Sequence, residues 1–171
     1  MTDCAERLEA PLLRLNDASP PRIEYVGPLN AKPRQLKLDL AAGELVGEVT
    51  KLPIIRRYED QDADRCLVYT LDEVVAEKLR CVMQRLQCRD LFDLHRLLVV
   101  CRVDAEAAWP NFERKARHRD LDPDRFAEYF ERRAPEWQRR WAAELVEYLG
   151  TFPHFDATMR AVRRELRFAL R

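Results

Sequence analysis

The hydrophobic period of the chain changes at Thr70, and this change constrains the fold more than any other feature of the sequence. Before Thr70, short alternating or β-branched segments are typical of strands. These segments are RIEYV, QLKLDL, ELVGEVT and RCLVYT, at residues 22–26, 35–40, 44–50 and 65–70. After Thr70, apolar residues recur at helical spacing. The sequence predicts an α+β protein, with a small mixed or antiparallel sheet in residues 1–69 and a helical bundle in residues 70–171, packed as one compact unit.

Turn and capping signals set the expected element boundaries. The short connection AAG predicts that residues 35–40 and 44–50 form a hairpin. Thr70 and Glu73 have the spacing of a capping box, in which hydroxyl and carboxylate bind the free amides at a helix start. Asp104 and Asp122 are expected to cap two later helices. The side chains expected to face the core share helical spacing and include Leu71, Leu79, Leu91, Leu94, Cys101, Trp137, Trp141, Tyr148, Met159 and Val162.

Composition excludes several classes of protein. Thirty basic residues balance thirty acidic ones, so a nucleic acid or membrane surface could be met only by a local patch. The five cysteines are odd in number and form no C-x-x-C pair, which argues against a disulfide framework and a zinc site. No apolar run approaches the roughly 18 residues of a membrane helix, and no signal-peptide core is present. We expect a cytoplasmic protein with no membrane partner.

Two charged residues stand where the helical pattern calls for apolar ones. At about 100° per residue, Lys78 falls in the middle of the apolar arc of the first helix. Asp90 falls within the arc of the second helix, and a hairpin of the two helices would join them as a buried pair. Arg89 and Asp93, four residues apart, would bracket this pair. Either the pair is a structural clamp, or Lys78 faces a cleft and holds a phosphate; the pattern leaves both open.

Two further sets of polar residues allow an ordinary and a functional interpretation. Asp39 lies on the polar face of segment 35–40, where it is a solvent-facing carboxylate or, if that face lines a cleft, a metal ligand or proton acceptor. A basic stripe follows the last helix and is either a wet surface or a track for a phosphate backbone. Its members include Arg160, Arg163, Arg164 and Arg167.

The middle of the chain resembles a known family. YTLDEVVAEKLRCVMQRLQCRDLFDLHRLL, residues 69–98, is similar to the signature of the AbiEii/AbiGii nucleotidyltransferase-like toxins, Y-S-L-E-E-I-x-A-E-K-L-x-A-L followed by R-D-L-Y-D-L. GPLNAKPRQLKLDL resembles the strand region that precedes this signature, and WAAEL resembles a late W-x-x-x-L pattern. The resemblance covers nearly all of the chain, closely in the middle and loosely at the ends.

This resemblance implies a nucleotidyltransferase fold, a role as the toxin of a toxin–antitoxin or phage-defence system, and use of a nucleoside triphosphate with Mg²⁺. It implies that Asp39 is a catalytic carboxylate and metal ligand, that Lys78 and Asp90 are catalytic, and that Lys78, Arg89 and Asp93 bind the nucleotide. Two further family motifs, a Gly-rich G-G-T-A-L-R type loop and an S-x-D-x-D strand, do not occur in the 171 residues. We therefore expect residues 1–69 to be an incomplete nucleotidyltransferase-like β region.

Two functions follow as hypotheses. The first is a nucleotidyltransferase-type toxin that transfers a nucleotide from a nucleoside triphosphate to an RNA or protein acceptor. It is either complete only with a missing N-terminal half or a partner chain, or inactive as this truncated chain. The second is a non-catalytic module that binds an antitoxin, another chain or RNA. Missing strands would leave a sheet edge exposed, and exposed edges tend to pair, so we also expect self-association.

Overall fold

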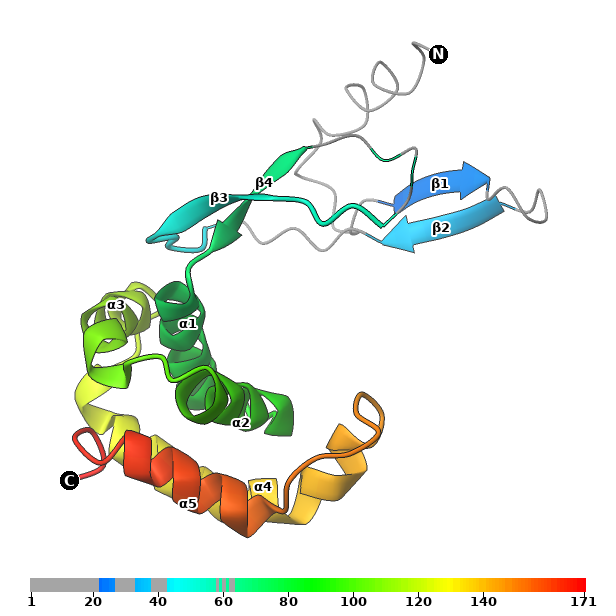
Figure 1. Ribbon diagram of the computed structural model, residues 1–171. Helices are drawn as coiled ribbons and strands as arrows, with labels where there is room; N and C mark the ends of the chain where they lie inside the picture. The colour runs from blue at the N-terminus through cyan, green and yellow to red at the C-terminus, as the bar shows by residue number, and fades with distance from the viewer. Residues whose placement is uncertain (1–21, 27–32, 38–42, 58, 60, 62–63) are drawn as a thin grey trace. The chain divides into compact units, whose positions relative to one another are not determined.

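The chain packs as two units, residues 1–44 and 45–171, which are described separately. The computed structural model describes residues 22–26, 33–37, 43–57, 59, 61 and 64–171 (Figure 1). In the first unit, β1 (Arg22–Val26) and β2 (Pro33–Lys37) pair as antiparallel strands. Arg22 lies opposite Lys37, and Val26 lies opposite Pro33.

The second unit joins a two-stranded hairpin to a helical bundle, which confirms the predicted α+β class. Its elements are β3 (Val49–Pro53), β4 (Arg65–Tyr69), α1 (Leu71–Gln84), α2 (Cys88–His95), α3 (Ala105–His118), α4 (Phe126–Leu145) and α5 (Phe155–Glu165). β3 and β4 are antiparallel. A π-helical segment, Arg96–Val100, extends α2, and a 3₁₀ turn, Pro123–Arg125, precedes α4.

The predicted hairpin between residues 35–40 and 44–50 is wrong. β2 pairs with β1, and β3 pairs with β4. Residues 44–48 form no strand because their backbone binds side chains of the helices: Lys115 Nζ donates to the Leu45 carbonyl at 2.6 Å, and Gly47 N donates to Glu73 at 3.0 Å. The expected strands at residues 22–26 and 65–70 are confirmed by β1 and β4.

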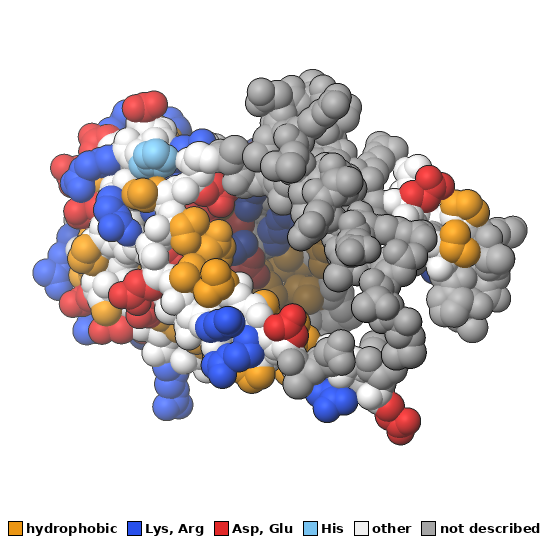
Figure 2. Space-filling model, turned by 90° about the horizontal axis from the view of Figure 1, so that it is seen from above, with side chains coloured by type: hydrophobic (Ala, Val, Ile, Leu, Met, Phe, Trp, Pro, Cys, Tyr) orange, Lys and Arg blue, Asp and Glu red, His pale blue; other side chains and the backbone are white. Residues whose placement is uncertain are grey.

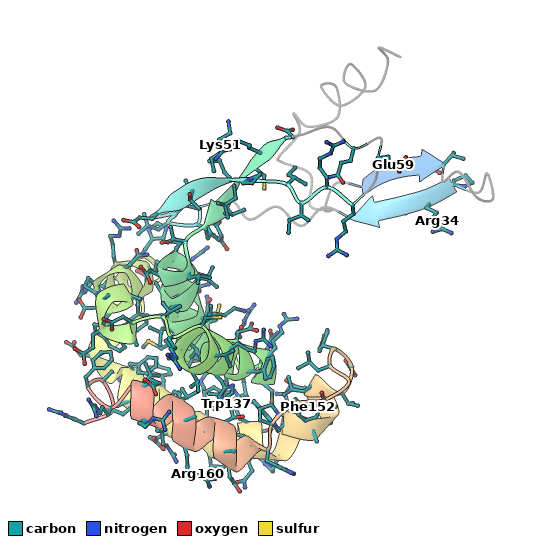
Figure 3. All side chains as sticks on the ribbon, viewed as in Figure 1. Arg34, Lys51, Glu59, Trp137, Phe152 and Arg160 are labelled. Atoms are coloured by element: carbon teal, nitrogen blue, oxygen red, sulfur yellow. The ribbon has the colours of Figure 1, made fainter. Side chains whose placement is uncertain are left out.

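The core of the second unit is a single cluster of apolar side chains between the helices. α1 packs against α2, α3 and α4, and α5 packs against α2 and α4. Aromatic rings run through the cluster, with centroids 5.4 Å apart for Phe112 and Phe126 and 5.5 Å apart for Phe130 and Trp137. Trp137 lies inside the bundle (Figure 3). The predicted core residues Leu79, Leu91, Leu94, Trp141, Met159 and Val162 are also buried.

Three residues predicted to face the core are exposed instead. Leu71 is the first residue of α1 and precedes the part of the helix that enters the core. Tyr148 follows the end of α4, so the helical stripe does not extend to it. Cys101 follows the π-helical segment, where its amide bonds to the Arg96 carbonyl at 2.9 Å. A π turn holds more residues than an α turn, so it rotates the residues after it away from the α-helical stripe.

The predicted helix caps are confirmed by hydrogen bonds of their side chains. The Thr70 hydroxyl accepts from Glu73 N at 3.2 Å. Asp104 accepts from Glu106 N at 2.9 Å, and Asp122 accepts from Asp124 N at 3.1 Å. The second half of the predicted capping box is wrong, because Thr70 N already donates to the carbonyl of Glu48 at 3.3 Å. The carboxylate of Glu73 therefore serves another contact.

That contact is a buried ion pair between α1 and α3. Glu73 is 1% exposed and Lys115 5% exposed, and Lys115 Nζ lies 2.6 Å from Glu73 Oε1. Asn111 Nδ2 also donates to Glu73 Oε2. A buried charge is tolerated only when its partners satisfy it, and here Gly47 N and the Leu45 carbonyl complete the set. We call these five residues the Glu73 clamp, and it ties the chain that enters β3 to both helices.

Gly47 is required in the Glu73 clamp because the carboxylate approaches its backbone closely. A Cβ atom at Gly47 would lie 2.5 Å from Glu73 Oε2 and 3.0 Å from Arg114 Nη2. The first distance is far below ordinary van der Waals contact, and the carboxylate cannot yield without weakening its bond to Lys115.

We predict that Gly47→Ala lowers the free energy of unfolding by about 1–3 kcal/mol, the usual cost of forcing an extra carbon into a filled site. Gly150→Ala is the matched control, because a Cβ there meets no atom within 4 Å. Urea titration followed by tryptophan fluorescence measures both variants. Equal stability of the two alanine variants would contradict the role assigned to Gly47.

Candidate functional site

The predicted Lys78–Asp90 pair is present between α1 and α2. Lys78 lies in the middle of α1, and Asp90 lies in the first turn of α2. Lys78 Nζ is 3.2 Å from Asp90 Oδ1 and 2.5 Å from Asp93 Oδ2. The side chain of Asp90 is 0% exposed, whereas that of Lys78 is 21% exposed and that of Asp93 37% exposed. The ammonium therefore has one fully buried partner and one that solvent reaches.

Arg85 is a member of this cluster that the sequence analysis missed. Its Nε lies 2.8 Å from Asp90 Oδ2, and its Nη2 lies 2.9 Å from Asp90 Oδ1. This two-point contact is the favoured geometry of a guanidinium with a carboxylate. Arg85 is the C-terminal cap of α1 and lies in the turn between the helices, where helical periodicity does not apply. The only signal was a cation five residues before a predicted buried acid.

Three groups of the cluster, Lys78, Arg85 and Asp90, are held in their ionised forms by their partners. Burial by itself raises the pKa of Asp90, but hydrogen bonds from Arg85 and the charge of Lys78 outweigh it, so the pKa lies below its ordinary 3.8. Burial by itself lowers the pKa of Lys78. The hydrogen bond to Asp93 and the charges of Asp93 and Asp90 outweigh this effect, so the pKa lies above its ordinary value. The hydrogen bond to Asp90 raises the pKa of Arg85.

Arg89 does not join this cluster, so the prediction that it brackets the pair is wrong. No ion pair links Arg89 to Asp93 among the residues that the structure describes. Arg89 is exposed and lines a separate small cavity of about 170 Å³ with Arg140 and Glu144. Asp90 points inward from the neighbouring position, so Arg89 is turned away from Lys78 by one step of the helix, about 100°.

The described residues do not build a metal site. Asp39, the predicted metal ligand, lies outside them. Within the described part of the chain, no group of three or more His, Cys, Asp or Glu side chains is placed to hold an ion. Asp90 and Asp93 are two carboxylates, but both already bind cations of the protein. These residues therefore do not fit a divalent ion as they stand.

The predicted arginine stripe is divided between two surfaces. Arg160, which lies on α5 (Figure 3), and Arg163 line a hollow of about 340 Å³. Arg164 and Arg167 line a different one of about 660 Å³. Arg163 is neutralised by Glu131, with N–O distances of 3.0 and 2.5 Å. Arg164 is likewise paired with Glu165, at 3.0 Å, and the role of the stripe in binding a phosphate backbone stays a prediction.

The Glu73 clamp was also missed from sequence, although it had a readable signal. Lys115 lies between Phe112 and Ala116 on the buried stripe of α3, and a cation in such a position needs a buried partner. Burial raises the pKa of Glu73, but the bonds from Gly47, Lys115 and Asn111 outweigh this effect and lower it. The pairing joins residues 42 positions apart, which no local pattern displays.

The fold and these clusters define an α+β protein with a partly exposed cation held by acids between two helices. Over residues 8–161 the chain matches the family described as nucleotidyl transferase AbiEii toxin, type IV TA system. The chain belongs to this family, as the resemblance of residues 69–98 predicted. The family is one of nucleotidyltransferase toxins of type IV toxin–antitoxin systems.

No curated protein and no solved structure matches the chain. In the part of the chain that the structure describes, no helix is both long and apolar enough to cross a bilayer.

We predict that Asp90→Asn lowers the free energy of unfolding by about 2–3 kcal/mol at pH 7. This loss is smaller than the roughly 3–5 kcal/mol that breaking a fully buried ion pair costs. In the variant, Lys78 still has Asp93 as a partner, and the partly exposed Arg85 can be solvated by water. The carboxylate of Asp90 has a lowered pKa, so its contribution is present above about pH 3.8 and is lost as the pH falls through the lower folded value. The variant should therefore lose less stability than the wild type in this acid range.

Urea unfolding at a series of pH values between about 7 and 2 measures both effects. Asp156→Asn, an exposed acid on α5, is the matched control and should change stability at pH 7 by less than about 0.5 kcal/mol. An equally steep acid dependence in wild type and Asp90→Asn would show that Asp90 is not the titrating group.

Proposed function

We propose that this chain acts as a nucleotidyltransferase toxin that binds a nucleoside triphosphate through Lys78 and passes the nucleotide to an RNA or protein acceptor. In that reaction the acceptor bonds to the α-phosphorus and pyrophosphate leaves. The single observation that supports the proposal is the partly exposed side chain of Lys78, set within the family signature, with its ammonium positioned by two carboxylates. Nucleotidyl transfer depends largely on positioning and charge neutralisation, which such a cation can supply.

The donor groups of the cluster leave room for a phosphate. An ammonium has three N–H donors, and Asp90 and Asp93 engage two of them. Arg85 binds Asp90 through Nε and Nη2, and its side chain is 41% exposed. Phosphate oxygens are therefore expected to meet the third N–H of Lys78 and the remaining N–H groups of Arg85. Arg89 is part of this proposal only as an outer contact, because it lies away from Lys78.

The two acids are expected to behave differently when a triphosphate binds. Asp90 is fully buried and fixed by Arg85, so it stays in place and keeps the ammonium oriented. Asp93 is partly exposed, so it is the partner that a phosphate can replace. The family implies use of Mg²⁺, and because the described carboxylates do not form an ion site, their role in this proposal is confined to orienting Lys78.

The same activity implies a set of partners. A toxin of a type IV system has a cognate antitoxin, and we propose a protein antitoxin as the partner of this chain. A cytoplasmic location and a part in phage defence belong to the same proposal, since nucleoside triphosphates and the acceptor are found in the cytoplasm.

A second candidate function is a non-catalytic module that binds an antitoxin, another chain or RNA. One observation favours it: Lys78 is already neutralised by two acids of the protein. In that case the cluster is a structural clamp of α1 and α2, and triphosphate binding is absent.

Calorimetric titration with each nucleoside triphosphate in the presence of Mg²⁺ separates the two candidates. We expect the wild type to bind at least one triphosphate and Lys78→Ala to bind it at least tenfold more weakly, equivalent to about 1.4 kcal/mol or more. Lys51→Ala, which removes one exposed cation from β3, is the matched control and should bind as the wild type does. Circular dichroism confirms that each variant is folded.

Absence of binding to the wild type, with Lys78→Ala only less stable, would favour the non-catalytic module. If binding is present, transfer of a nucleotide labelled at its α-phosphate into cellular RNA or protein identifies the class of acceptor.

A further inference from the structure

The hydrogen-bond alternation of the β3–β4 hairpin shows which backbone groups point outward. Ile54 N donates to the Asp64 carbonyl at 2.8 Å at one end, and Thr70 N donates to the Glu48 carbonyl at 3.3 Å at the other. Bonded and non-bonded pairs alternate in an antiparallel ladder. In the observed register, Cys66 and Val68 of β4 therefore face β3, whereas Arg65, Leu67 and Tyr69 direct their N–H and C=O groups to the outer edge.

The outer edge of β3 is protected against a further strand. Pro53 has no N–H to donate, and the Lys51 carbonyl accepts a hydrogen bond from Arg65 Nη2 at 2.8 Å. The side chain of Lys51 also extends away from the hairpin (Figure 3), and an edge lysine discourages pairing.

In the described part of the chain, nothing protects the centre of the outer edge of β4 in this way. Arg65 N–H is bound by Asp64 Oδ1 at 2.7 Å. The peptide groups of Leu67 and Tyr69 have no backbone partner among the residues that the structure describes. Their side chains are large and apolar, and 69% and 45% exposed. Hydrophobic side chains lie among charges of both signs on the surface of the described part (Figure 2).

We propose that the outer edge of β4 pairs antiparallel with β4 of a second copy of this chain. A two-fold axis at Leu67 sets Leu67 opposite Leu67 of the second copy and Tyr69 opposite Arg65 of the second copy. This register engages all three outward residues of β4, and each pair exchanges two backbone hydrogen bonds. Arg65 N–H exchanges the Asp64 carboxylate for the Tyr69 carbonyl of the second copy.

Side-chain charge favours this register over its neighbours. Arg65, Leu67 and Tyr69 lie on one face of the sheet, because successive strand residues alternate between faces. The two-fold sets Arg65 opposite Tyr69 of the second copy and so keeps the two Arg65 cations apart, while each guanidinium stays bound to the Lys51 carbonyl of its own hairpin. A register that paired Arg65 with itself would set like charges opposite each other, which destabilises a sheet. The product is a four-stranded sheet in the order β3–β4–β4–β3 with an isologous interface.

Light scattering with size-exclusion chromatography of the full chain, across the micromolar range, tests the proposal. The expected mass is twice the 20.2 kDa of one chain. Leu67→Pro removes an outward N–H but leaves the β3–β4 hydrogen bonds intact, so it should give a monomer. Lys51→Pro is the matched control, because it removes an outward N–H from the opposite edge, and it should remain a dimer.

A charge exchange tests the register itself. Leu67→Glu and Leu67→Lys should each be monomeric, because each places like charges at the two-fold axis. An equal mixture of the two variants should form a heterodimer, since unlike charges then meet there. An interface elsewhere on the chain would not respond in this way.

A monomeric wild type, a Leu67→Pro variant that remains dimeric, or a charge-exchange mixture that stays monomeric would each overturn the proposal. None of these measurements requires a nucleotide, so failure of the dimer leaves the proposed transferase activity open to its own test.

Discussion

The buried pair of Glu73 and Lys115 is the interaction on which the arrangement of the second unit depends. Removing two charges from water costs several kcal/mol for each ion, and their attraction offsets this cost only when every remaining group is satisfied. Gly47, Asn111 and the Leu45 carbonyl supply those groups. The pair therefore fixes three segments at once: α1, α3 and the chain that enters β3. A glycine at position 47 follows from this closeness.

α1 is held by ions on two of its sides, and this explains why its charged residues occur where they do. Glu73 and Glu77 face Lys115 of α3, while Lys78 faces Asp90 and Asp93 of α2. The apolar residues of α1 fill the space between these contacts, as Val75, Leu79 and Val82 are fully buried. The ion pairs add direction to a core that apolar packing alone would orient less strictly.

The charged clusters around α1 could be predicted from the sequence only where a charged residue interrupted a local apolar pattern. Lys78 and Asp90 interrupt apolar stripes, so their pairing was predictable from helical periodicity. Arg85 interrupts nothing, because it lies in a turn where no period holds. Glu73 satisfied a local capping rule so well that its partner, 42 residues away, went unnoticed.

The prediction of strand pairing failed for a related reason. Strands that are neighbours in sequence usually pair, but residues 45–47 instead bind side chains of helices that are distant in sequence. Helix class and caps depend on the nearest four residues and were therefore predictable, whereas pairing depends on the whole chain.

The two acids that hold Lys78 are unequal, and this inequality bears on what the cluster can do. Asp90 is bound by two cations in the core, so its position is set by the fold rather than by solvent or solutes. Asp93 meets Lys78 at the surface, where water and ions compete for both groups. Burying the second acid as well would add a further desolvation cost of several kcal/mol, so the exposed position of Asp93 is the less costly arrangement for the pair. The side chain of Lys78 is itself partly exposed, and partial exposure is a condition that any anionic ligand of Lys78 requires.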